Sequence, residues 1–381
     1  MHSRFILCLP LVLALHDYSR LPAANPALNI QPLAAELKGI PQTLLSLIHA
    51  PEVQAELKLN SKQLDSFLPT LQKIDGPWWR ARILPEPQRR NVTAEQEKLL
   101  IAELQRRFGP TVVHRLRQLE LQAQGYRMLL RPEMISHLEL SKEQLDNLKS
   151  LFDSTDSIGA KIHANLGQVD AELSKQFEEA RQAELQLAPK ALRPDQQAKV
   201  IQAIGKIFDV SKLERIYPLA PELIDSENWF GTDRPKLRQL RGKVVLVHFY
   251  AFQCHNCIAN FRIYNRWQES LASKGVQLIG IQTPETSTES DPNAVSQAAQ
   301  RDGFKFPVLI DLKKANWDAW SNTMWPTVYV IDKQGYVRFW WQGELNWQGA
   351  THDQTIEKLV DKLLQEQPTS SVALDSTASA R

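Results

Sequence analysis

The sequence predicts two structural classes in one chain, an all-α region over residues 25–215 followed by an α/β domain over residues 216–367. The first region is rich in Leu, Gln, Glu, Lys and Arg, and its apolar residues recur at helical spacing. The second region contains β-branched apolar runs separated by helix-like segments, and it holds most of the tryptophans. A length of 381 residues is enough for two or three domains of about 150 residues each.

Composition and charge exclude two classes of protein. Lys plus Arg (45) and Asp plus Glu (43) nearly cancel, so the chain lacks the one-signed field that binding to a phosphate backbone needs. We therefore expect no nucleic-acid partner. The longest apolar run, residues 5–15, is shorter than the roughly 20 residues of a transmembrane helix. An internal membrane-spanning helix is therefore not expected.

Residues 1–24 have the parts of a secretory signal. A short basic start precedes the apolar run over residues 5–15, and small residues follow at Ala23 and Ala24. We expect export, which predicts a periplasmic protein or one that is membrane-anchored and faces outside the cytoplasm. The signal is either cleaved or retained as an anchor. If it is retained, residues 5–15 would associate with the membrane. A disordered leader is the remaining alternative.

The helical region contains an internal repeat. Residues 51–63 resemble residues 132–144, at an offset of 81 residues, and a shorter core recurs in residues 92–96 and 192–196. Each core predicts a helix start, in which Asn60, Thr93 or Ser141 caps the first turn and a Gln three residues later closes a capping box. The pattern is similar to the Leu-Thr-x-x-Gln motif of extracytoplasmic helical stress and chaperone-like proteins. It identifies no partner for this region.

Trp78 and Trp79 follow Gly76-Pro77 within the helical region. They predict either an exposed contact patch or burial in the helical packing.

The elements of the second region alternate between strand and helix. Apolar runs predict strands, and the first and fourth are continuous enough for central strands that are covered on both faces. The expected strands are residues 244–251, 276–281, 306–310, 327–331 and 336–342, and the expected helices are residues 258–274, 291–301, 313–321 and 351–365. Residues 332–335 predict a hairpin turn. Residues 368–381 are small and polar, which predicts a disordered tail.

The cysteines carry the clearest chemical signal. Cys8 lies in the leader, and the other two form Cys254-His-Asn-Cys257, directly after the first strand and at the start of a helix. A helix N-terminus favours a thiolate, so Cys254 is expected to be reactive and Cys257 to resolve a mixed disulfide. A zinc site needs about four ligands, and no second cysteine pair supplies them. We therefore expect neither a metal nor a cofactor.

Residues 216–367 resemble the thioredoxin-like domain of the TlpA and ResA group, and especially the exported domain of DipZ-type proteins. The resemblance rests on residues 240–247, 254–257, 282–285, 316–320, 325–332 and 335–338. It implies a thiol-disulfide oxidoreductase that acts on protein thiols and disulfides, together with a membrane or extracytoplasmic redox partner. It also implies a cis peptide between Trp325 and Pro326 that shapes the substrate groove.

The sequence departs from the family near the second cysteine. The buried acid of related domains is matched by His248 or Asn260, neither of which is acidic. His248 is therefore either the proton acceptor for Cys257 or a hydrogen-bonded core histidine. His255, next to Cys254, would favour the thiolate, which predicts a redox potential above the thioredoxin value of about −270 mV.

A second function class stays open on the sequence alone. The chain could be a helical binding or scaffold protein whose thioredoxin-like domain is regulatory or holds a static disulfide. A buried Cys254 sulfur would favour this alternative, and an accessible sulfur would favour the oxidoreductase.

Overall fold

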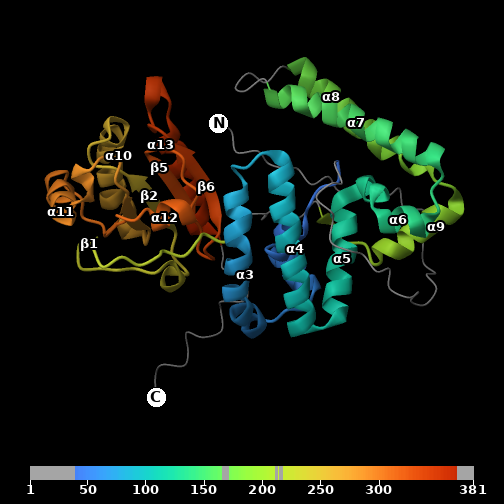
Figure 1. The fold of residues 1–381 in the computed structure, drawn as a ribbon, viewed down its shortest axis with the longest axis horizontal. Helices are drawn as coiled ribbons and strands as arrows, with labels where there is room; N and C mark the ends of the chain where they lie inside the picture. The colour runs from blue at the N-terminus through green and yellow to red at the C-terminus, as the bar shows by residue number, and fades with distance from the viewer. Residues whose placement is uncertain (1–38, 165–170, 211–212, 214–217, 367–381) are drawn as a thin grey trace. The chain divides into compact units, whose positions relative to one another are not determined.

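The structure is a computed structural model that describes residues 39–164, 171–210, 213 and 218–366 (Figure 1). The chain divides into two compact units. The helical unit comprises residues 1–59 and 85–216, and the α/β unit comprises residues 60–84 and 217–381. The predicted leader and tail lie outside the described residues. Within the described ranges, every helix is too short or too polar to traverse a bilayer.

The helical unit confirms the predicted all-α class. Its helices are α1 (Leu44–Ile48), α2 (Pro51–Glu56), α4 (Glu86–Phe108), α5 (Pro110–Gln124), α6 (Pro132–Leu138), α7 (Lys142–Ala164), α8 (Ala171–Leu187) and α9 (Pro194–Ile204). A core of fully buried side chains, among them Leu121, Met128, Leu138 and Ile204, joins α5, α6, α7 and α9. The amphipathic pattern in the sequence therefore produces a packed core among these helices.

The two long repeat copies adopt the same local geometry. In the second copy, Gln144 N donates to Ser141 Oγ at 3.2 Å, and Ser141 N donates to Gln144 Oε1 at 3.0 Å, which is a reciprocal capping box. Asn60 caps its helix in the same way. Lys58 and Glu139, at equivalent positions, both have left-handed backbones, with φ of 56° and 51°. The repeat is thus structural.

The expected cap at Thr93 is wrong. Thr93 lies within α4, which already begins at Glu86, after Pro85 as N-cap. The Thr93 hydroxyl instead donates to the Arg89 carbonyl oxygen at 2.9 Å, a bond inside the helix. An earlier helix start therefore overrides the local capping pattern.

The α/β unit contains one six-stranded sheet with the order β1-β4-β3-β2-β5-β6. Its strands are β1 (Trp229–Phe230), β2 (Val245–Tyr250), β3 (Gln277–Gln282), β4 (Val308–Ile310), β5 (Thr327–Ile331) and β6 (Val337–Gln342). β2, β3 and β4 are parallel, whereas β5 and β6 join in antiparallel pairs. The five predicted strands are confirmed. The two-residue β1 was not predicted because it lacks an apolar run.

Side chains of β2 alternate between the two faces of the sheet. Leu246 and Tyr250 belong to the core that includes residues of α10 (His255–Leu271), α11 (Pro292–Arg301) and α13 (His352–Gln365). Val247 and Phe249 belong to a second core with Trp320, the residue that follows α12 (Ala315–Ala319). Cores on both faces form the three-layer arrangement that the sequence predicted.

Helix α3 (Ser61–Ala81) belongs to the α/β unit, although the sequence assigned it to the helical region. Trp79 is buried in the core on the second face of the sheet. Its ring lies 6.0 Å from the Tyr329 ring and 5.2 Å from the Trp340 ring, both in edge-on geometry. Trp79 is therefore a buried residue, as one interpretation held, but it packs on the sheet and not among helices.

Candidate functional site

The Cys254-His-Asn-Cys257 segment joins the end of β2 to the start of α10. Cys254 is the N-cap of α10, with an extended backbone, and its N–H donates to the Ala251 carbonyl at 3.2 Å. The N–H groups of Cys257 and Ile258 both donate to the Cys254 carbonyl, at 3.0 and 3.1 Å. This turn places the Cys254 side chain at the positive end of the helix.

The two thiols lie in different environments. Cys254 is half-buried and Cys257 is fully buried, and both are free. A hydrogen bond with Cys257 lowers the pKa of Cys254, and the backbone N–H groups of Cys257 and Asn256 add to this. Burial raises the pKa of Cys257. The pair therefore combines a half-buried cysteine that favours the thiolate with a buried cysteine whose thiol stays protonated.

The Trp325–Pro326 peptide is cis, as the resemblance implied. The Trp325 ring stacks on Trp317 at 4.0 Å, and its Nε1 donates to the Thr283 carbonyl at 3.1 Å. Trp325 and Cys254 are both half-buried against the same apolar cluster that contains Cys257. The structure thus brings the loop before β5 and the cysteine pair to one core.

His248 is an aromatic core residue in this structure. Its ring stacks on Tyr264 at 4.1 Å, and among the described residues its Nε2 has no hydrogen-bond partner. Burial lowers the pKa of His248 to about 3. Since protonation is disfavoured there, the geometry supports the core interpretation, although without the expected hydrogen bond at Nε2. His255 is exposed on the first turn of α10.

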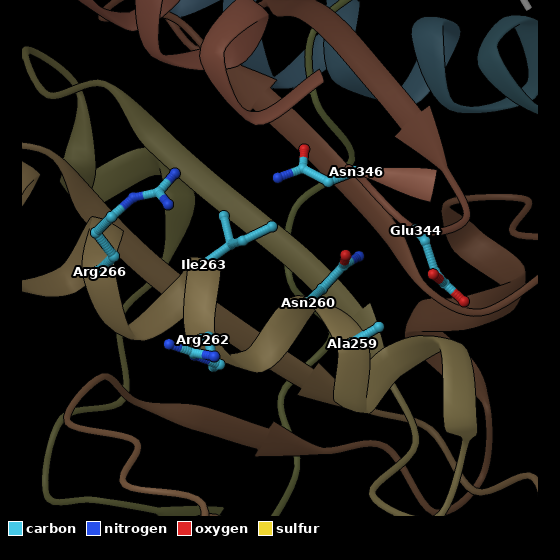
Figure 2. A pocket seen from close by; sticks show the side chains of 7 residues that line it. All are labelled: Ala259, Asn260, Arg262, Ile263, Arg266, Glu344 and Asn346. Carbon is cyan, nitrogen blue, oxygen red and sulfur yellow. The ribbon is translucent and has the colours of Figure 1, made fainter. Parts of the chain in front are cut away.

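Asn260 holds the segment that follows β6. Its Oδ1 accepts from Leu345 N at 2.9 Å, and its Nδ2 lies 3.3 Å from the Gly343 carbonyl. A pocket of about 470 Å³ opens beside it, between α10 and this segment (Figure 2). Arg262, Arg266, Glu344 and Asn346 contribute to its polar lining. An amide supplies both a donor and an acceptor here, which an ionised carboxylate could not.

Glu285 and Glu289 are the acids that the sequence analysis missed. The charge of Glu285 partly opposes the lowering of the Cys254 pKa, and it adds to the burial that raises the pKa of Cys257. The order of the strands was a signal for the position of these acids. Tyr250 pairs with Gln282 in parallel strands, so the loops that follow the two strands meet at one edge of the sheet.

Glu289 is fully buried and connects these two loops. Its Oε1 accepts from Gln253 N at 2.7 Å, while Oε2 accepts from Glu285 N at 2.8 Å and Thr286 N at 2.9 Å. Three charge-assisted bonds to backbone N–H groups compensate a buried carboxylate well. Glu289 therefore fixes the backbone immediately before Cys254.

Residues 227–340 match the model of the AhpC/TSA family. The fold of the α/β unit is thioredoxin-like. Over 122 residues the chain is 36% identical to DipZ of Mycobacterium bovis, covering 31% of this chain and 18% of that protein. Over 146 residues it is 24% identical to the thiol-disulfide oxidoreductase YkuV of Bacillus subtilis, covering 38% of this chain and 94% of that protein.

A thiol-disulfide isomerase structure from Corynebacterium glutamicum is also similar, at 22% identity and a TM-score of 0.33, over 40% of this chain and 98% of that one. These matches cover two fifths of the chain or less, and the chain spans less than a fifth of the length of DipZ.

Proposed function

We propose that the protein is an exported thiol-disulfide oxidoreductase that uses Cys254 and Cys257 to reduce, oxidise or exchange disulfides in extracytoplasmic proteins. The observation that carries this proposal is the contrast between the two thiols. A half-buried helix N-cap cysteine with a lowered pKa lies next to a fully buried cysteine with a raised pKa. A static structural disulfide would need neither the exposure nor the contrast.

In the reducing direction, the Cys254 thiolate attacks a substrate disulfide, forms a mixed disulfide and releases one substrate thiolate. The Cys257 sulfur then loses its proton and attacks Cys254, which frees the second substrate thiolate and leaves a Cys254–Cys257 disulfide. Two electrons pass from the pair to the substrate, and oxidation runs through the same steps in reverse. These steps use no bound cofactor.

The apolar surface near the pair supports a polypeptide substrate. Ile258, next to Cys257, is 50% exposed, and Met324, next to Trp325, is 46% exposed. In this proposal Trp325 and Pro326 shape the groove, and a membrane or extracytoplasmic redox partner restores the pair. The signal-like pattern of residues 1–24 supports export. Fusing these residues to a reporter enzyme and fractionating the cells would test it.

Insulin reduction in the presence of dithiothreitol tests the activity. Wild-type protein should accelerate precipitation of the insulin B chain, and Cys254→Ser should remove the acceleration, because the attacking sulfur is gone. Wild-type protein that leaves the dithiothreitol rate unchanged, while its thiols titrate as free, would contradict the proposal. It would favour the alternative of a helical binding protein with a regulatory thioredoxin-like domain.

A further inference from the structure

Three residues of α3 attach this helix to the α/β unit through one stripe of its surface. Asp75, Trp79 and Arg82 follow one another at intervals of four and three residues, with Arg82 as the C-cap residue, so they share a helix face. Asp75 is buried, and its Oδ2 accepts from the backbone N–H of Leu219 at 3.0 Å. The other two contact the chain around Trp320.

Arg82 holds two carbonyl groups at the end of α12. Its Nη2 lies 2.7 Å from the Trp320 oxygen and 3.0 Å from the Ser321 oxygen. Trp79 Nε1 also donates to the Trp320 oxygen, at 3.0 Å, and the Arg82 guanidinium stacks 3.8 Å from the centre of the Trp79 ring. A cation bonded to helix-terminal carbonyls forms a strong, oriented interaction.

These carbonyls begin the loop that leads to Trp325 and Pro326. Trp320 and Ser321 are both buried, and Ser321 has a left-handed backbone with φ of 48°. The rest of the loop is held from β5, where Tyr329 Oη donates to Asn322 Oδ1 at 2.7 Å and Thr327 Oγ1 donates to the Met324 carbonyl at 2.8 Å. Arg82 thus supports the start of the loop, where Tyr329 Oη of β5 makes only a long contact of 3.5 Å to the Trp320 oxygen.

We propose that Arg82 and Trp79 are positioning residues that hold the loop over residues 320–326 in the geometry that binds a substrate polypeptide. This inference rests on the proposed oxidoreductase function and extends it to a helix far outside residues 227–340, which match the family model. The chain segments before and after α3 belong to the helical unit, so the backbone joins α3 to that unit at both ends.

The role of Arg82 gives a specific kinetic pattern. Arg82→Gln removes the charge and loosens the loop, so KM for insulin should rise about three- to tenfold while kcat stays unchanged. The alkylation rate of Cys254 by a small reagent should also stay unchanged, because Arg82 does not contact the cysteine pair. Arg80→Gln makes the same charge change at an exposed position of α3 and should match wild type in every measurement.

Hydrogen exchange followed by mass spectrometry tests the positioning independently of activity. In full-length Arg82→Gln, peptides covering residues 320–326 should exchange faster than in wild type and in Arg80→Gln. Equal exchange in the three proteins would overturn the inference, and so would faster exchange without a rise in KM. If wild type fails to reduce insulin, the proposed function fails, and exchange still decides whether Arg82 holds the loop.

A conservative variant keeps the test informative if Arg82→Gln does not fold. Trp79→Phe retains the aromatic packing and removes only the Nε1 donor to Trp320. It should raise exchange over the same residues by a smaller factor, and no change relative to wild type would count against a role for this bond.

Discussion

The Glu289 carboxylate and the Gln253 backbone are joined by a 2.7 Å hydrogen bond at the position just before Cys254. The same carboxylate binds the two N–H groups of Glu285 and Thr286, so one buried acid connects the loops that follow β2 and β3. In this structure the geometry of the cysteine turn depends on an acid more than thirty residues away along the chain.

Glu289→Gln should therefore loosen the cysteine turn. The neutral amide keeps one acceptor oxygen but turns its nitrogen toward a donor, which should cost about 1–3 kcal/mol of stability. Because the turn also positions the N–H groups that stabilise the Cys254 thiolate, alkylation of Cys254 at a pH below its pKa should slow. Urea unfolding measures the loss of stability, and the alkylation rate measures the effect on Cys254. An unchanged alkylation rate would show that Glu289 does not hold the cysteine turn.

Glu285→Gln should have the opposite effect on Cys254. The hydrogen bond with Cys257 lowers the pKa of the Cys254 thiol and the negative charge of Glu285 opposes this, so removing the charge favours the thiolate and stabilises the reduced pair. The redox potential should become less negative, by about 10 mV for a screened interaction of roughly 0.5 kcal/mol. Glu269→Gln, at an exposed site near the other end of α10, is the matched control.

The Glu285 effect should also depend on salt. High ionic strength screens an exposed charge, so the difference in potential between Glu285→Gln and wild type should shrink as salt is added. A difference in the opposite direction, or an equal change in Glu269→Gln, would contradict the assignment.

A substitution at His255 tests the redox potential expected for the cysteine pair. A cationic imidazole next to Cys254 would stabilise the thiolate, so the wild-type potential should lie above about −270 mV and should fall in His255→Pro. Proline fits the first helical position, which limits any effect on folding. Equilibration with glutathione measures both values. A potential that does not move in the variant would show that the exposed ring does not act on the sulfur.

Glu97 makes the stability of the helical unit depend on pH. Burial and the charge of Glu120 raise the pKa of Glu97 to about 8. The charges of Arg117 and Arg131 and a hydrogen bond from Leu44 N act in the opposite direction but do not offset this rise. The folded unit therefore holds a proton that the unfolded chain releases above about pH 4.5. Its contribution to stability is full below that pH and falls as the pH rises toward 8, by an amount on the order of a few kcal/mol.

The variant Glu97→Gln should flatten this dependence. At pH 8 it should unfold at a higher urea concentration than wild type, and the two should converge near pH 4.5. Glu95→Gln, an exposed site on the same helix, should keep the wild-type profile. Circular dichroism monitors the urea unfolding at each pH. If stability depends on pH in the same way in wild type and Glu97→Gln, this assignment is contradicted.

Most of the thioredoxin-like unit could be predicted because its strands are continuous apolar runs and its cysteine pair sits at a strand–helix junction. The place of α3 could not, since an apolar helical stripe shows that a face is buried but not which core receives it. Glu289 was missed for a related reason. It lies in a polar segment rich in Thr, Ser and Glu that is typical of an exposed loop, and only the tertiary fold buries its carboxylate.

The most direct test of the account is a trapping measurement with Cys254 and Cys257 replaced in turn by serine. When each variant is incubated with a disulfide-bonded protein substrate and examined by non-reducing mass spectrometry, Cys257→Ser should accumulate a mixed disulfide on Cys254, because the resolving sulfur is gone. Cys254→Ser should accumulate none, since the buried Cys257 thiol stays protonated. Equal trapping by both variants, or by neither, would contradict the assignment of Cys254 as the attacking sulfur.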